Sequence, residues 1–137
     1  IRISLRYNLQ QNFRKSDGTL VSESRVPRIK IEYQITATIF LRGVVQYTSR
    51  FRDDLRDNSR TEMPIYFKDS DDNYIPALSE TSNDIEADFL FSYRPKPGTL
   101  VFFGYGSALT EPNRFRFQSL ARQTDGFFLK ISYLFQS

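Results

Sequence analysis

Apolar and polar side chains alternate along six stretches of this chain. In "IRISLRYNL" (1–9), every odd-numbered residue is apolar or aromatic and every even-numbered residue is polar. The same period of two recurs in "RIKIEYQ" (28–34), "IFLRGVVQYTS" (39–49), "IEADFLFSYR" (85–94), "LVFFGYGSAL" (100–109) and "FFLKISYLFQ" (127–136). Successive side chains of a strand point to opposite faces of a sheet, so the pattern predicts six β-strands, each with one apolar face. Helical periodicity is poor, and we expect an all-β, antiparallel fold.

The segments between these stretches differ in length. "QITATI" (34–39) and "RPKPGT" (94–99) are short, and the Pro and Gly residues of the second end one strand and reverse the chain. The other three, approximately 10–26, 49–84 and 110–125, are long and polar. Short turns at one end of a sheet and long loops at the other are typical of a transmembrane β-barrel. The predicted strands also have about the 9–11 residues that cross a bilayer at a tilt.

In a transmembrane barrel the apolar face meets lipid and the polar face lines a wet lumen. The charged residues that alternate with the apolar positions then face the lumen: Arg6, Lys30, Glu32, Arg42, Glu86, Asp88 and Lys130. They could line a selective pore, or they could form ion pairs that fill the barrel. In a water-soluble barrel the two faces would exchange roles, and alternation alone does not distinguish the two arrangements.

Aromatic residues on the apolar face gather toward the ends of the predicted strands. Tyr33, Tyr93, Tyr133 and Phe135 lie toward the short-turn end, and Tyr47 and Tyr105, with Tyr7 as a further candidate, lie toward the long-loop end. We expect them to form the two interfacial girdles that flank the apolar band of such barrels. The alternative is that they are ordinary cross-strand aromatic neighbours.

The composition excludes several chemistries. The 137 residues include no Cys and no His, so thiol nucleophiles, imidazole acid–base catalysis and His or Cys metal sites are absent. We therefore expect no enzymatic activity and no cofactor. The net charge of +3 is spread along the chain rather than clustered, so we expect no nucleic-acid partner. No stretch is long and apolar enough for a membrane helix.

Three segments resemble a known family. The first, "YQITATIFLRGVVQYTS" (33–49), resembles a tyrosine and a short turn followed by a strand with "VQY". The second, "FLFSYRPKPGTLVFFGY" (89–105), resembles two aromatic strands joined by an "R-P-G-T/S" turn. The third, "FFLKISYLFQ" (127–136), resembles a closing "K-x-S/T-Y-x-F" strand. Together they resemble the C-terminal barrel region of the DUF5916 family of outer-membrane proteins, which often carry an N-terminal carbohydrate-binding family 9-like domain. Ala37 and Thr38 depart from the family's Pro-Arg turn, and Lys96 and Pro97 lengthen the second turn.

This resemblance implies an outer-membrane location for residues 1–137, as the C-terminal part of one barrel with the C-terminus in the periplasm. Six strands are fewer than the eight of the smallest single-chain barrels, so either further strands lie upstream of Ile1 or several chains close one barrel, and we favour upstream strands. The expected partners are the lipid bilayer, lipopolysaccharide, the outer-membrane assembly machinery, which recognises the last strand in similar proteins, and other outer-membrane proteins.

Three loop motifs remain. Asp69, Asp71, Asn73 and Glu80 have the spacing of a calcium loop, but Tyr74 replaces its glycine, and the alternative is an acidic hairpin tip within the external loop 49–84. Gly104 and Gly106 are expected to make room for a bulky neighbour on the lumen face or to permit strong local curvature. The mixture of Arg and Phe in 112–123 could bind sugar or lipopolysaccharide phosphate, or could simply extend the strands above the membrane.

The sequence thus predicts a pore or transport-type outer-membrane barrel of unknown substrate. A structural or interaction scaffold in an outer-membrane complex is the first alternative, and a soluble lipocalin-like binding protein is the second.

Overall fold

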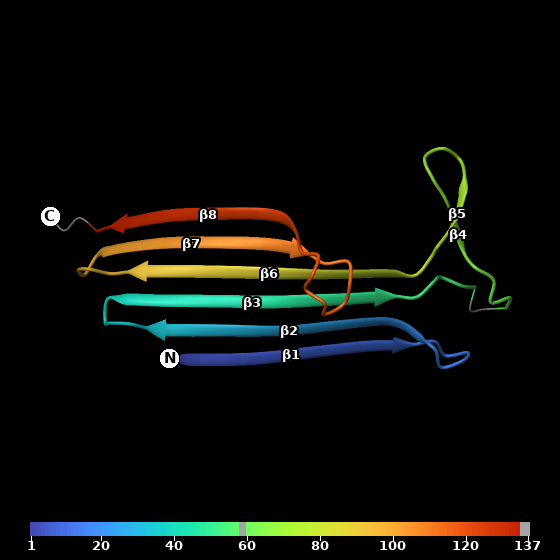
Figure 1. Cartoon of the computed structure of the whole chain (residues 1–137), viewed down its shortest axis with the longest axis horizontal. Helices are drawn as coiled ribbons and strands as arrows, with labels where there is room; N and C mark the ends of the chain where they lie inside the picture. Colours follow the sequence, from blue (N-terminus) through green and yellow to red (C-terminus); the bar gives the residue numbers. More distant parts are fainter. Residues whose placement is uncertain (58–59, 135–137) are drawn as a thin grey trace.

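The computed structural model describes residues 1–57 and 60–134 and is built from antiparallel strands (Figure 1). The main sheet contains β1 (Arg2–Phe13), β2 (Leu20–Gln34), β3 (Ile39–Arg52), β6 (Glu80–Tyr93), β7 (Thr99–Thr110) and β8 (Ala121–Tyr133). A separate hairpin pairs β4 (Tyr66–Lys68) with β5 (Tyr74–Pro76). Within the described ranges no helix is long and apolar enough to cross a membrane. The predicted all-β, antiparallel class and its six main strands are confirmed.

The six strands lie side by side in the order β1-β2-β3-β6-β7-β8, so each strand pairs with its neighbour in the chain apart from the inserted hairpin. All five pairings are antiparallel. β1 and β8 form the two edges, and no pairing between them closes the sheet among the described residues. The structure is therefore an open meander, with the 34–39 and 94–99 turns at one end and the other three connections at the opposite end (Figure 1).

The strands extend farther into the polar segments than the sequence pattern indicated. β1 continues to Phe13 and β2 already begins at Leu20, so the first connection covers only 14–19 rather than 10–26. The second and third connections shorten to 53–79 and 111–120. The reason is that ladder hydrogen bonds join backbone groups, and polar side chains such as those of Ser22 and Ser24 do not interrupt them.

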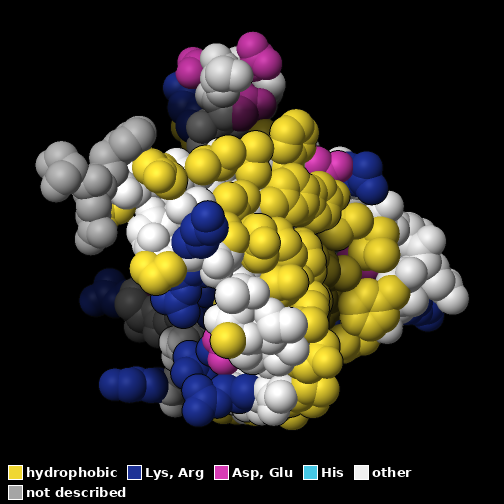
Figure 2. Space-filling view, turned by 90° about the vertical axis from the view of Figure 1, so that its left-hand side faces the viewer, with side chains coloured by type: hydrophobic (Ala, Val, Ile, Leu, Met, Phe, Trp, Pro, Cys, Tyr) yellow, Lys and Arg dark blue, Asp and Glu magenta, His cyan; other side chains and the backbone are white. Residues whose placement is uncertain are grey.

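The two faces of the sheet are strongly unlike each other. Hydrophobic side chains gather along one face and Lys and Arg side chains gather on the opposite side (Figure 2). Among the described residues only Val44 and Tyr47 are buried hydrophobic residues, whereas most large apolar side chains are exposed. The described chain thus has no extensive apolar core of its own, and its hydrophobic residues form a surface.

Candidate membrane face and polar face

The apolar face is made by odd-numbered residues of all six main strands. The cross-strand register aligns them in rows, such as Tyr33–Leu41–Phe91–Phe103–Leu129 and Ile3–Ile31–Gly43–Phe89–Tyr105. Most of the large members are exposed: Ile3, Leu5, Tyr7, Leu9, Ile29, Ile31, Tyr33, Val45, Phe89, Tyr93, Phe103, Tyr105, Phe127, Leu129, Ile131 and Tyr133. An exposed apolar surface that spans a whole sheet exceeds what a monomeric soluble protein normally shows to water.

The apolar face ends at a definite height on the central strands. On β6 it runs from Tyr93 to Ile85, and the next residue on the same face is the polar Asn83. The nine residues from Tyr93 to Ile85 span eight residue steps, or about 26 Å along the strand. A tilt of about 40° would reduce this to a height of about 20 Å, about 5 Å less than the roughly 25 Å apolar band of outer-membrane barrels.

Three of the predicted girdle residues lie together near the short-turn end. Tyr33, Tyr93 and Tyr133 are at or next to the ends of β2, β6 and β8, and all three are exposed on the apolar face. Phe135, the fourth residue predicted for this girdle, lies outside the described residues. At the other end, Tyr105 is exposed and its hydroxyl donates to Asp125 Oδ1 at 3.0 Å. An apolar ring with a hydrogen-bonded hydroxyl suits an interface between lipid and water.

Tyr47 does not fit the predicted girdle. Its side chain is only 6% exposed, because the 111–120 loop folds over it. The Tyr47 ring lies 4.7 Å from the Phe115 ring and 5.5 Å from the Phe117 ring, measured between centroids. Its hydroxyl donates to Asn83 Oδ1 and accepts the N–H of Phe115, each at 3.1 Å. Tyr47 therefore anchors a loop, and alternation could not reveal this role because the contacting residues lie about seventy positions away.

The seven charged residues predicted to face a lumen all lie on the face opposite the apolar one. Register places Glu32 directly opposite Arg42, and places Lys30 and Asp88 on either side of Val44. Lys30 Nζ also lies 3.0 Å from Glu32 Oε1 on its own strand. The polar face thus mixes both signs of charge across β2, β3 and β6, with Arg6 on β1 and Lys130 on β8 nearer the edges.

Gly104 lies on this polar face, where it makes room for a ring. A Cβ atom at Gly104 would overlap the Phe128 ring of β8, which lies across it, and a Cβ at Gly106 would lie 3.1 Å from Asp88 Oδ1. The prediction that Gly104 accommodates a bulky neighbour is therefore confirmed. β7 presents little side chain at this point, so Phe128 occupies the space between the strands.

The 111–120 loop is held over the sheet by two buried carboxylates. Glu111, 1% exposed, accepts the N–H groups of Asn113 at 3.2 Å and Ser119 at 3.0 Å, which fixes the turn of the loop. Arg114 then reaches over β6 and β3: its Nε donates to Ser49 Oγ at 2.9 Å, and its Nη1 donates to Glu23 Oε1 on β2 at 2.8 Å. In Figure 1 this loop lies across β6 and β3, short of their long-loop ends.

These contacts change the interpretation of the Arg- and Phe-rich segment 112–123. Arg114, Phe115 and Phe117 contact the chain's own sheet, and Phe115 and Phe117 remain 43% and 49% exposed. Phe115 and Phe117 adopt φ of 58° and 51°, a conformation that is costly for residues with a Cβ. The ring contacts with Tyr47 and the Arg114 hydrogen bonds offset that cost.

Glu23 has an unusually low pKa for a glutamate. Its carboxylate accepts hydrogen bonds from Arg25 at 2.9 Å, Gln11 at 2.7 Å and Arg114 at 2.8 Å. These donors, led by Arg25, lower the pKa of Glu23 from 4.5 to about 2, against the opposing effect of desolvation. Glu23 lies beyond the Tyr47 row, outside the apolar band, and remains charged there at any physiological pH.

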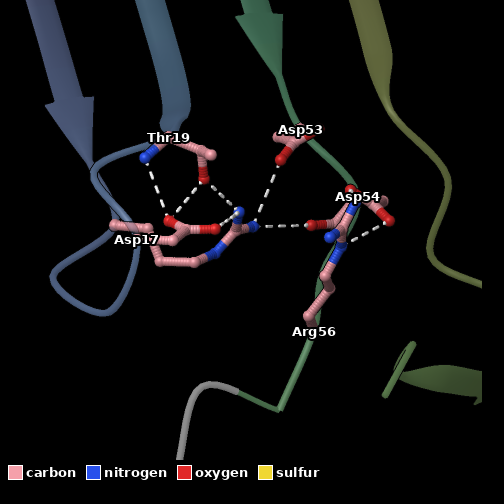
Figure 3. A network of polar contacts seen from close by, with 6 residues as sticks. Asp17, Thr19, Asp53, Asp54 and Arg56 are labelled. Carbon is pink, nitrogen blue, oxygen red and sulfur yellow. Dashed lines mark hydrogen bonds and ion pairs between the residues drawn. The ribbon is translucent and has the colours of Figure 1, made fainter. Parts of the chain in front are cut away.

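A buried arginine, Arg14, joins two connections at the same end of the sheet. The Arg14 side chain, 4% exposed, donates to Thr19 Oγ1 at 2.6 Å and to the Asp54 carbonyl at 3.4 Å, and it pairs with Asp53 at 3.2 Å. Asp17 and Thr19 lie on one side of this network and Asp53 and Asp54 on the other (Figure 3). The 14–19 turn is thereby tied to the segment that follows β3. No local sequence pattern indicated this network, because Asp53 is 39 residues from Arg14.

The calcium candidate is not assembled. Asp69 Oδ1 accepts the N–H groups of Asp71 and Asn73, each at 2.9 Å, which closes the tip of the β4–β5 hairpin. These hydrogen bonds lower the pKa of Asp69, led by the one from Asn73. Glu80 instead pairs with Arg52 at 3.1 Å on the main sheet. Across 1–57 and 60–134, no group of three Asp, Glu, His or Cys side chains is arranged to hold a metal ion.

Comparison with known proteins found no matching family model, no matching curated protein and no matching solved structure.

Proposed function

We propose that this chain is part of an outer-membrane β-barrel that serves as a pore or transport-type component. The observation that carries the proposal is the division of the sheet into an exposed apolar face and an opposite face that holds the seven charged residues predicted to face a lumen. Lipid is the solvent in which an exposed apolar face of this size is stable. The polar face then lines an aqueous lumen.

The burial of neighbouring valines supports this orientation. Val44 on the polar face is 7% exposed, whereas Val45 on the apolar face is 48% exposed. Such a difference is expected of a sheet that curves toward its polar face, because side chains converge on the concave side of a barrel wall. The unpaired edges of β1 and β8 are also consistent with pairing to further strands, since open edges are not stable in lipid.

The proposed location and family rest on the sequence resemblance described above. The segments 33–49, 89–105 and 127–136 resemble the barrel region of the DUF5916 outer-membrane proteins. The partners that this assignment implies are the bilayer, lipopolysaccharide at the long-loop end, other outer-membrane proteins, and the assembly machinery acting on the last strand. We assign the barrel no catalytic role.

Two measurements on the intact protein test the proposal. Cell fractionation is expected to recover it in the outer membrane, and insertion into planar bilayers is expected to give stepwise ionic conductance. Recovery as a soluble protein without detergent would contradict the membrane location and favour a lipocalin-like binding protein.

A scaffold barrel that passes no ions is the second candidate. Phe128 lies over Gly104 on the polar face, and Lys30 pairs with Glu32 there, so side chains on this face already contact one another. A barrel filled in this way would fractionate with the outer membrane but give no conductance.

A further inference from the structure

A hollow of about 420 Å³, lined mostly by polar and charged residues, lies at the long-loop end of the polar face, away from the seven charged residues described above. Two cross-strand rows on β1, β2, β3 and β6 form its floor. The first row is Gln10–Ser24–Arg50–Ser82, and the second is Asn12–Ser22–Arg52–Glu80. We propose that this hollow binds a neutral oligosaccharide through the first row.

The two rows differ in how far their hydrogen-bonding groups are already used. In the second row, Asn12 Nδ2 donates to Ser22 Oγ at 2.7 Å and Arg52 pairs with Glu80 at 3.1 Å. In the first row, the Gln10 amide and the Ser24 and Ser82 hydroxyls have no hydrogen-bond partner within 1–57 and 60–134. The side chains of the second row are thus held by each other, whereas those of the first row offer available donors and acceptors.

Charge decides against an anionic ligand. The two arginines of the hollow are each paired with a carboxylate, Arg52 with Glu80 and Arg50 with Asp84 at 3.6 Å. An incoming phosphate or carboxylate would have to displace those partners and would meet their negative charge. A neutral ligand needs no such displacement.

The free groups match the chemistry of a saccharide. Serine hydroxyls and the glutamine amide both donate and accept hydrogen bonds, as sugar hydroxyls do. Arg50 is 64% exposed at its side chain and keeps further N–H groups in a fixed plane, which can reach adjacent hydroxyls of one ring. Four neighbouring strands extend over about 14 Å, so the row is long enough for several linked sugar units.

The hollow lies at the long-loop end of the sheet. If the chain is the barrel proposed above, this end of the polar face is the external mouth, and the bound saccharide is a transported solute on its way in; this part rests on the proposed function. The binding step itself depends only on the two rows.

Titration of the intact protein in detergent micelles with maltotriose, cellotriose and triacetylchitotriose, all three of them neutral, tests the inference. At least one of them is expected to bind, with a dissociation constant of about 1 mM because the row is open to water. The double substitution Ser24→Ala and Ser82→Ala is expected to weaken that binding by about fivefold or more. The control Ser92→Ala, on the same face of β6 but at its short-turn end, is expected to bind as the unchanged protein does.

Three results would overturn the inference: no binding of any of the three sugars up to about 20 mM, equal binding by the double variant, or tighter binding of the anionic trigalacturonate. If the double variant does not fold, Gln10→Ala on the exposed edge strand β1 replaces it, with the same expectation. Conductance measured on the same preparation separates the two proposals. A protein that binds sugar but passes no ions would support the saccharide site and contradict the proposed pore.

Discussion

Val44 and Val45 are the same residue type, adjacent on the same strand, and their surroundings are opposite. Val44 lies between Lys30 and Asp88 in its row and is buried, whereas Val45 lies between Ile29 and Ala87 and is about half exposed. In a water-soluble sheet the valine with apolar neighbours would be the buried one. The comparison shows that, at this point of the sheet, side chains on the polar face cover one another more fully than those on the apolar face, as the proposed barrel requires.

The largest effect is expected when an arginine is introduced, in two separate variants, on each face of β3. If the chain is the barrel proposed above, Val45→Arg is expected to lower the free energy of unfolding from liposomes by about 2–4 kcal/mol, because the guanidinium would then lie in hydrocarbon. The control Gln46→Arg, on the polar face opposite Glu86, is expected to change it by about 0.5 kcal/mol or less. Because the chain has no Trp, urea titration followed by circular dichroism measures the free energy of unfolding of both variants. Equal effects of the two substitutions would show that water bathes both faces.

A second test contrasts two tyrosines of the apolar face. Tyr47→Phe removes a hydroxyl that holds both Asn83 and the Phe115 N–H, and is expected to destabilise the protein by about 1–2 kcal/mol. Tyr33→Phe, at an exposed position near the short turns, is expected to have almost no effect. The same denaturant titration compares them. An unchanged stability for Tyr47→Phe would mean that the 111–120 loop does not rest on this ring.

The glycines of the two faces give a third, smaller contrast. Gly104→Ala is expected to cost about 1 kcal/mol, since its methyl group would push aside the Phe128 ring. Gly43→Ala, on the apolar face with open space around it, is expected to be neutral or slightly stabilising. Adding Phe128→Ala should remove the penalty of Gly104→Ala in a double-mutant cycle. Simple additivity of the two substitutions would contradict the contact.

The last test concerns pH at the rim of the apolar face. The pKa of Glu23 is lower in the folded protein, about 2, than its ordinary 4.5, so its ionised form stabilises the fold above pH 4.5. That stabilisation is lost progressively as the pH falls from 4.5 toward 2. Hydrogen exchange at the Phe115 amide, corrected for intrinsic rates, should therefore accelerate over this range. In Glu23→Gln this pH-dependent acceleration should be absent, and its persistence would assign the effect to another carboxylate.

Local patterns were sufficient for the parts of the fold that depend on one strand at a time. The alternation of Ile29, Ile31 and Tyr33 with Lys30 and Glu32 predicted both faces of β2, because side-chain direction follows position in a strand with a period of two. The Pro-rich 94–99 segment likewise predicted its turn. The space needed at Gly104 was also foreseen, although the residue that fills it was not.

The boundaries of the strands were harder to predict. Residues such as Ser22 and Ser24 carry no strand signal of their own, yet they lie within β2 because β1 and β3 both pair with that segment. The first connection was consequently predicted too long, and the contrast between long and short connections is smaller there than the sequence suggested.

What the sequence determined by itself is the division of each strand into an apolar and a polar side, and the two ends at which the chain turns. Only the tertiary structure decided that Tyr47 lies beneath a loop, that Arg114 reaches Glu23 across 91 residues of sequence, and that Arg14 joins two connections. The physical reason is the distance along the sequence between the residues that interact. Strand alternation is a property of consecutive residues, whereas a buried ion pair depends on which distant segments the sheet brings together.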